Sequence, residues 1–241
     1  MKKNSLKVQQ LTYGPSKTGK SLFSNLSFEY EGTPTLLLGV NGAGKTTLLR
    51  LLAGQLKPKV GKISTEGTVI YVPQMFIPIN GFTCIEYASY TAWLNGQSKK
   101  IASKEAIKWL RFVGLEKEAD QRCDRLSGGQ KTRLALAASL NSRSDILLLD
   151  EPSASLDPLS RSMLTSLYRD IASQGIGLIV STHDALDIST PFENAIVLDS
   201  GTVLFEGRTS EFLHGDLESP IARELSKAFL VRNTDVNNSL D

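Results

Sequence analysis

Residues 35–46 read TLLLGVNGAGKT, an apolar run that passes directly into a glycine-rich loop ending in Lys and Thr. The continuous apolar run predicts a short buried strand. Four leucines, at positions 48, 49, 51 and 52, follow at helical spacing and predict a helix that begins at the end of the loop. The backbone N–H groups of such a loop and the N-terminus of the following helix form a cradle for phosphate. The unit therefore predicts a nucleotide-binding site made of Gly39, Val40, Asn41, Gly42, Ala43, Gly44, Lys45, Thr46 and Thr47.

The pattern GxxxxGK[ST] occurs a second time, at residues 14–21, which read GPSKTGKS. The residues that follow this copy, 22–28, alternate between apolar and polar side chains and predict a strand. No helix N-terminus then points back at the loop, so its backbone cannot form the same cradle. We interpret this copy as a polar hairpin loop and place the phosphate site at residues 39–46.

Two carboxylates lie at the end of a second apolar run, residues 146–149, which is followed by Asp150 and Glu151. A carboxylate at the exposed end of a buried strand suits the outer coordination sphere of Mg²⁺, which it reaches through a bound water, while the Thr46 hydroxyl is a direct ligand. Glu151 is the next residue along the chain, where it could polarise an attacking water. Such a pair alone is weak evidence for a magnesium and water-activating site, because strands often end in acidic turns. The phosphate loop in the same chain strengthens that interpretation.

The remaining pattern alternates strands with helices and predicts an α/β fold with a mostly parallel sheet. Residues 6–11, 22–30, 69–72, 177–181, 195–198 and 202–205 are the further predicted strands. Residues 83–140 read as helical, with breaks at Asn95-Gly96 and Gly114, and predict an insertion into the sheet domain. We expect one domain over residues 1–232, with a core of residues 1–75 and 145–215 and a helical subdomain over about 76–144. Residues 233–241 are polar and predicted to be disordered.

The amino-acid composition is that of an ordinary globular protein. The 241 residues include 27 basic and 25 acidic side chains, a net charge of +2, which is too balanced to indicate nucleic-acid binding through bulk charge. No apolar run approaches the roughly 20 residues of a membrane-spanning helix, and no signal peptide follows the first lysines. Two cysteines without metal-ligand spacing suit a reducing compartment. We therefore expect a cytoplasmic location.

Residues 126–130 read LSGGQ and lie shortly before Asp150. Ser127 is a favourable helix N-cap, and the glycines allow backbone N–H groups to approach an anion closely. Together with the phosphate loop and the acidic strand end, this segment resembles the signature of the ATP-binding cassette (ABC) family. The resemblance extends from Tyr13 to Gly207, and the motifs are specific as a group. Small departures are Thr132 after the signature and Thr33-Pro34 before the phosphate loop.

The resemblance implies a role for further residues. It implies a P-loop ATPase core with an N-terminal antiparallel β subdomain and an inserted helical subdomain, binding ATP and Mg²⁺. Gln74 resembles the glutamine that joins the core to the helical subdomain and senses the metal and the attacking water. Residues 155–157, ending in Asp157, resemble the D-loop, and His183 resembles the histidine that contacts the γ-phosphate. Tyr13 lies where the family places an aromatic that stacks on adenine. By the same resemblance Ser127, Gly128, Gly129 and Gln130 contact ATP held by a partner.

Partners follow from the family as well. The resemblance implies a head-to-tail pair of cassettes, either a homodimer or a heterodimer with another ABC ATPase, bound to a separate transmembrane permease on the inner face of the cell membrane. Residues 75–86 contain Phe76, Ile77, Ile79 and Phe82, which suit either a permease contact or the core of the helical subdomain. Residues 82–96 resemble short export-type cassettes, so export is favoured.

Two alternatives to transport belong to different classes. A cassette ATPase acting on nucleic acid or ribosomes usually carries long coiled coils or two cassettes, which do not fit one copy of each motif in 241 residues. A regulatory nucleotide-binding module that does not hydrolyse ATP would not need Glu151 and His183. A neighbouring gene for a six-helix membrane protein would discriminate transport from both.

Overall fold

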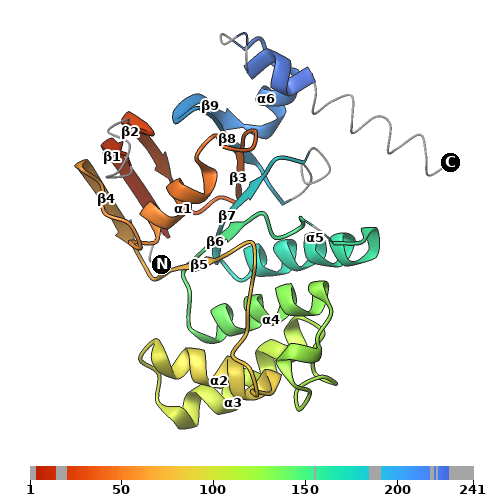
Figure 1. Ribbon diagram of the computed structural model, residues 1–241. Coiled ribbons are helices and arrows are strands. Elements are labelled where there is room, and N and C mark those ends of the chain that lie inside the picture. Colours follow the sequence, from red (N-terminus) through yellow and green to blue (C-terminus); the bar gives the residue numbers. More distant parts are fainter. Residues whose placement is uncertain are drawn as a thin grey trace, which may run out of the picture.

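The computed structural model describes residues 4–14, 21–154, 156–184, 191–217, 220 and 222–227. Two sheets lie beside each other, and a group of helices forms the opposite end of the molecule (Figure 1). The strands are β1 (Ser5–Tyr13), β2 (Phe23–Tyr30), β3 (Thr35–Leu38), β4 (Val60–Glu66), β5 (Val69–Val72), β6 (Ile146–Asp150), β7 (Gly177–Thr182), β8 (Asn194–Asp199) and β9 (Thr202–Arg208). The helices are α1 (Lys45–Leu52), α2 (Cys84–Leu94), α3 (Lys99–Phe112), α4 (Gly128–Asn141), α5 (Pro158–Ser173) and α6 (Thr209–His214), with a 3₁₀ turn at Cys123–Arg125.

The larger sheet has the strand order β5-β6-β7-β3-β8-β9, in which all neighbours are parallel except the final pair. Its register aligns the carboxyl ends of three strands. Leu38 lies beside Thr182, and Asp150 lies beside Ser181. The segments that follow β3, β6 and β7 therefore leave the sheet at the same edge, which is where open α/β sheets bind ligands.

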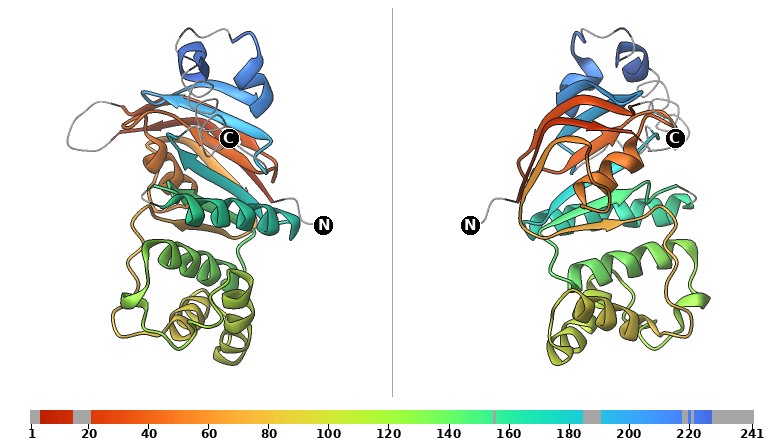
Figure 2. Two further views of the ribbon diagram at one scale, coloured as in Figure 1. Left: turned by 90° about the vertical axis from the view of Figure 1, so that its right-hand side faces the viewer. Right: turned by 60° about the vertical axis from the view of Figure 1, so that its left-hand side comes forward.

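Both faces of this sheet are covered, which explains its unbroken apolar strands. Successive residues of β3 alternate between two cores, with Leu36 and Leu38 on one side and Leu37 on the other. The first core contains α4 and α5, and the second contains α1 and the three-stranded sheet. Figure 2 shows these layers from the side, with α5 running along one face of the sheet. The predicted α/β class with a mostly parallel sheet is confirmed.

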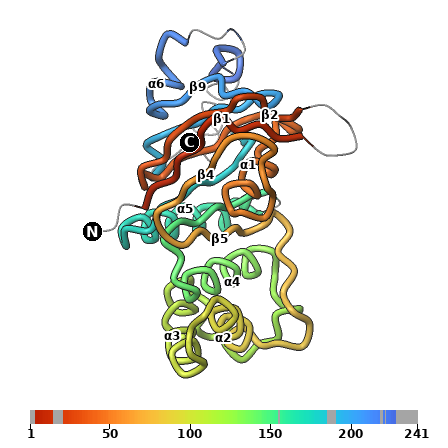
Figure 3. Tube along the Cα trace, turned by 90° about the vertical axis from the view of Figure 1, so that its left-hand side faces the viewer, coloured from red at the N-terminus to blue at the C-terminus, as the bar shows by residue number. Residues whose placement is uncertain are grey.

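The smaller sheet is antiparallel, with the order β2-β1-β4. Figure 3 shows it next to α1. The Leu22 N–H donates to the Tyr13 carbonyl oxygen at 2.7 Å, which closes the hairpin between β1 and β2. The second GxxxxGK[ST] copy thus lies between two antiparallel strands and is followed by no helix, as expected, although residues 15–20 of that copy fall outside the described part of the chain.

Helices α2, α3 and α4 all lie between β5 and β6, which are neighbours in the sheet. They pack around small side chains, with Ala88, Ala106 and Ala138 forming a cluster of their own. The predicted breaks are present, since α2 is capped by Asn95 and α3 ends before Gly114, where φ is +71°. None of the helices among the described residues is long and apolar enough to cross a membrane.

Two elements were not anticipated. Strand β4 exposes all but one of its side chains, so it shows no apolar alternation, and α6 has six residues, too few to show a helical period. Ala53 caps the C-terminus of α1, and Gly54 follows with φ of +70°. The cysteines, Cys84 and Cys123, are free and buried, and the predicted disorder of residues 233–241 falls outside the described residues.

Candidate functional site

The glycine-rich loop joins the end of β3 to the start of α1. A Cβ atom at Gly39 would lie 2.4 Å from the Leu198 carbonyl oxygen, so only glycine fits there. Gly44 is the N-cap of α1 with φ of 107°, and no side chain caps this helix. The first helical hydrogen bond runs from the Leu48 N–H to the Gly44 carbonyl oxygen. The N–H groups of residues 45–47 therefore have no partner within the helix, and this helix end attracts anions.

Lys45 is 95% buried at the first position of α1, with a relative exposure of 5%. Its Nζ donates to the carbonyl oxygens of Gly39 at 2.7 Å and Val40 at 3.3 Å. It also forms an ion pair with Glu151 Oε1 at 3.1 Å. The ammonium group is thus held against the loop by three acceptors, at the position where it can meet a phosphate bound by the loop.

Asp150 is the last residue of β6 and is 2% exposed. Ser181 Oγ donates to one carboxylate oxygen at 2.7 Å, and the Tyr71 hydroxyl donates to the other at 3.0 Å. Burial and the charge of Asp150 raise the pKa of the Tyr71 phenol above its ordinary value, so the phenol remains a hydrogen-bond donor. Sequence reasoning missed Tyr71 and Ser181, because neither belongs to a motif that carries chemistry alone.

Glu151 lies at the centre of the site and is reached by three groups from separate segments. Gln74 Nε2 donates to Glu151 Oε2 at 3.4 Å, His183 Nδ1 lies 3.0 Å from the same oxygen, and Lys45 lies against the other oxygen. The backbone of Glu151 has φ of 45°, and its N–H donates to Ser181 Oγ at 3.0 Å. This left-handed turn directs the carboxylate away from the strand.

A second group of predicted residues gathers where α4 and α5 begin. Ser127 caps α4, accepting a hydrogen bond from the Gln130 N–H, while the Gln130 side chain accepts from the Ser127 N–H. Asp157 caps α5 through Ser160, and these hydrogen bonds hold the pKa of Asp157 below its ordinary value. The two helix ends touch, because a Cβ at Gly129 would lie 2.8 Å from Ser160 Oγ.

The two groups stay apart within one chain. No hydrogen bond or ion pair of the described residues joins Ser127–Gln130 or Asp157 to the cluster around Glu151. Tyr13 belongs to neither group. It lies at the end of β1, half-buried against the core that contains Ala43 and Leu48. Each group by itself contains only some of the residues that were predicted to contact ATP.

The donors beside the loop fit a magnesium ion. Thr46 is exposed at the second position of α1 and supplies a hydroxyl, and Asp150 supplies a carboxylate. The amide nitrogen of Gln74 faces Glu151, which leaves its oxygen for a cation. Hydroxyl, carboxylate and amide oxygens are ligands that Mg²⁺ prefers, and it keeps water and substrate phosphate in the remaining positions. Among the described residues, no group of three or more His, Cys, Asp or Glu side chains is arranged to hold a metal ion.

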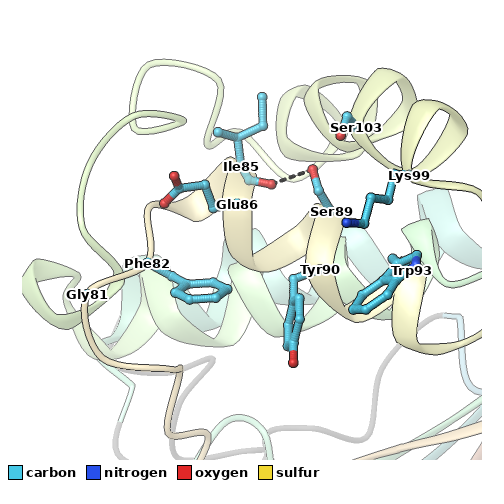
Figure 4. Close-up of a pocket in the computed structure, with 9 residues that line it drawn as sticks. All are labelled: Gly81, Phe82, Ile85, Glu86, Ser89, Tyr90, Trp93, Lys99 and Ser103. Carbon is cyan, nitrogen blue, oxygen red and sulfur yellow. Dashed lines mark hydrogen bonds between the residues drawn. The ribbon is translucent and has the colours of Figure 1, made fainter.

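An aromatic groove of about 630 Å³ opens on the outer side of α2 (Figure 4). Three rings line it in a row, Phe82 with Tyr90 at 5.4 Å between centroids and Tyr90 with Trp93 at 5.6 Å. Met75 and Ile77, in the segment between β5 and α2, are 76% and 78% exposed. Phe76 instead packs against Tyr87 and the core, so the segment 75–86 divides between the surface and the interior.

The chain resembles known proteins along most of its length. The profile of the ABC transporter family matches residues 23–154. The energy-coupling factor transporter ATP-binding protein EcfA1 of Ligilactobacillus salivarius is 30% identical, over 98% of this chain and 91% of its own length. The phosphonates import ATP-binding protein PhnC of Lactiplantibacillus plantarum is 33% identical, over 86% of this chain and 90% of its own length.

The fold is also shared with solved structures. The structure of cbiO1 from Clostridium perfringens, part of the ABC transporter complex cbiONQ, superposes with a TM-score of 0.79 at 27% identity. The superposition covers 93% of this chain and 95% of that one. The expectation of export finds no support here, since PhnC is an import protein by name.

Proposed function

The chain belongs to the ABC transporter family, whose ATP-binding members are ATPases, and on that premise we propose that it hydrolyses ATP to power transport through a separate membrane permease. One observation carries the proposal. The carboxylate of Glu151 is held by Lys45, Gln74 and His183 beside a phosphate loop that begins an uncapped helix. The cluster combines a phosphate-binding cation, a candidate base and two polar groups that orient it.

In this proposal the loop residues 39–47 bind the ATP phosphates through backbone N–H groups, and Lys45 meets the β- and γ-phosphates. Glu151 accepts a proton from the attacking water, and His183 contacts the γ-phosphate. Thr46, Asp150 and Gln74 would hold Mg²⁺, which would neutralise charge on the phosphate oxygens. Tyr13 stacks on the adenine, which contributes about 1–3 kcal/mol by analogy with base stacking elsewhere.

The separation of the two residue groups supports a site shared between two cassettes. A head-to-tail pair would bring Ser127, Gly128, Gly129, Gln130 and Asp157 of one chain to the ATP on the loop of the other. The N–H groups of Gly128 and Gly129 at the start of α4 would then add hydrogen-bond donors to the phosphates. Both a homodimer and a heterodimer with a related cassette satisfy this arrangement.

The groove beside α2 is the proposed permease contact. Its aromatic row, together with the exposed Met75 and Ile77, offers an apolar surface that a helical segment of a membrane protein can fill. The segment that carries this surface begins directly after Gln74, whose side chain contacts Glu151. A movement of the docked helix would therefore be transmitted to the catalytic edge through this one segment. The chain would then lie on the cytoplasmic face of the membrane. We assign no direction of transport, since residues 82–96 favour export while a relative is an importer.

We further propose that residues 1–75 and 145–215 form the catalytic core and that about 76–144 form the helical subdomain. The adjacency of β5 and β6 supports this division, because the helices α2–α4 leave the sheet and return to it at neighbouring strands.

Substitution Glu151→Gln tests the catalytic assignment. It keeps the shape of the side chain and removes the base, so ATP turnover should fall by about 10²–10⁴. ATP binding should persist, because Lys45 and the loop are intact. Phosphate release and fluorescent-nucleotide binding measure the two effects. Glu66→Gln, on the exposed strand β4, is the control and should leave both unchanged. Near-normal turnover in Glu151→Gln would remove Glu151 from the catalytic role.

A further inference from the structure

Helix α3 carries a row of basic side chains opposite the face that it buries. Ala102, Ala106 and Leu110 are fully buried, whereas Lys100, Lys104 and Lys108 are exposed. Each lysine precedes a buried residue by two positions, which is about 200° around the helix axis. The three lysines also recur every four residues, so they lie in one line along the outer surface of the helix.

Charge is concentrated on this helix. Residues 99–112 contain five basic side chains and one acidic side chain, a formal charge of +4, whereas the whole chain carries +2. The remainder of the chain is therefore net acidic. In the described chain the row has a single carboxylate partner, Glu105, whose oxygen lies 3.7 Å from Lys108. Arg111, the fifth basic residue of α3, is paired with Glu116, so the uncompensated positive charge of the helix lies on Lys99, Lys100 and Lys104.

Aromatic and aliphatic side chains accompany the lysines. Lys99 Nζ lies 5.0 Å from the centre of the Trp93 ring, and Lys108 Nζ lies 4.9 Å from the Trp109 ring. Leu94 and Ile101 are 61% and 42% exposed. Tryptophan, lysine and exposed aliphatic groups together are typical of surfaces that lie in the headgroup region of a membrane. Nucleic-acid binding is disfavoured, since the lysines cover the ring faces on which bases would stack.

The helix lies at the outer end of the molecule, away from the larger sheet (Figures 1 and 3). It also borders the proposed permease groove, which Trp93, Lys99 and Ser103 line together (Figure 4). If a permease docks there, α3 stands beside the membrane from which the permease emerges. The orientation of α3 toward the membrane rests on the proposed function, whereas its charge and its aromatic side chains do not.

We propose that α3, with Lys100, Lys104 and Lys108 as its charged row, binds an anionic phospholipid surface. Each lysine near such a surface contributes to binding, and the attraction fades within a Debye length, so the contact is strong only beside the membrane and weakens with salt. The contact would hold the helical insertion at the membrane in addition to any permease.

Sedimentation with lipid vesicles tests the proposal, with the full chain and no other protein. The chain should bind vesicles that contain about 30 mol% phosphatidylglycerol and not vesicles of pure phosphatidylcholine. The triple variant Lys100→Gln, Lys104→Gln, Lys108→Gln should lower the vesicle partition coefficient by roughly 10- to 100-fold. The matched control replaces Lys57, Lys59 and Lys62 by Gln, which changes the net charge equally on an exposed face near β4.

The control should retain binding, and both variants should keep the thermal melting temperature of the parent. Equal loss in both variants would show that overall charge alone acts, and would overturn the proposal. So would binding of the parent to a single-stranded oligonucleotide but not to vesicles. Because the vesicles contain no permease, absence of binding rejects the α3 surface and leaves the groove proposal untouched.

Discussion

At the scale of single residues, the catalytic edge depends on Lys45 having several acceptors at once. Its ammonium group is shared among two loop carbonyl oxygens and Glu151, in a position that is 95% buried. A buried ammonium needs such partners because its desolvation is costly. The same lysine therefore holds the loop in its conformation and supplies the positive charge of the site.

The duplicated pattern gives a direct comparison between two lysines. Lys45→Ala should abolish high-affinity ATP binding, because the cation that meets the β- and γ-phosphates is lost. Lys20→Ala should leave binding almost unchanged, since its copy lies in the β1–β2 hairpin, although Lys20 itself is outside the described residues. Isothermal titration with ATP measures both. Loss of binding in Lys20→Ala alone would place the phosphate site at residues 14–21 instead.

Single residues also mark the limit of prediction from this sequence. Lys45, Gln74, Glu151 and His183 belong to motifs, and the structure brings these predicted residues together. Tyr71 and Ser181 are common strand residues, and only the register of β5, β6 and β7 places their hydroxyls on Asp150. A hydrogen bond between residues 79 positions apart has no local sequence signal.

At the scale of elements, the helical insertion combines a capped frame with an exposed aromatic surface. Thr83 and Ser127 form capping boxes that fix where α2 and α4 begin. Tyr90 then points out of α2 between Phe82 and Trp93, in the middle of the groove (Figure 4). A ring row at the surface contributes more to binding a partner than to the fold.

A charge in this row should weaken the proposed permease contact. Tyr90→Glu puts a carboxylate between two rings, which a docked apolar helix cannot solvate. In the source organism, the amount of membrane protein that copurifies with the tagged chain after detergent extraction should fall at least about 10-fold. Basal ATPase activity should remain. Val60→Glu, at a 61% exposed valine on β4, is the control. Unchanged copurification in Tyr90→Glu would place the contact elsewhere.

Elements with strong apolar patterns were predictable. Strands β3, β6 and β7 are buried along their whole length, and α1 follows β3 with leucines on its buried face. Strand β4 was not, because it pairs with β1 through its backbone while its side chains face solvent. Backbone pairing of this kind is satisfied by almost any exposed sequence, so composition does not reveal it.

At the scale of the whole molecule, the two groups of predicted site residues lie on separate parts of one chain. The loop and Glu151 belong to the sheet, whereas Ser127–Gln130 begin a helix of the insertion. Gly129 is packed against Ser160, so a side chain there would disturb its own chain. A Cβ at Gly128 meets nothing within 4 Å, which makes Gly128 the better position for testing a contact across an interface.

A shared site predicts that two inactive proteins recover activity when mixed. Lys45→Ala damages both loops of a homodimer, and Gly128→Asp places a carboxylate against the γ-phosphate in both sites, where like charges repel. In the mixed dimer one site carries both changes and the other carries neither. Hydrolysis should therefore return toward about a quarter of the parental rate, from half of the dimers with one intact site each, in a phosphate-release assay.

Light scattering measures dimer formation in the presence of ATP in the same samples. This measurement is needed because strict coupling between the two sites could make the single intact site inactive. A mixed dimer that forms and shows neither hydrolysis nor ATP retention would contradict a shared site. In the control mixture Thr65→Glu, which adds the same charge at an exposed position on β4, replaces Gly128→Asp. That mixture should keep about half of the parental rate, because half of its sites have an intact loop and all have an intact signature.

The strand order of the larger sheet also determines when each strand can pair during translation. Strand β3 is made early, but its neighbours β7 and β8 follow about 140 and 155 residues later. At a translation rate of about 5–20 residues per second, roughly 7 to 30 s pass before β3 can pair. During that interval four consecutive residues destined for the interior have no strand beside them. The newborn chain therefore depends on protection from wrong partners until its last third has left the ribosome.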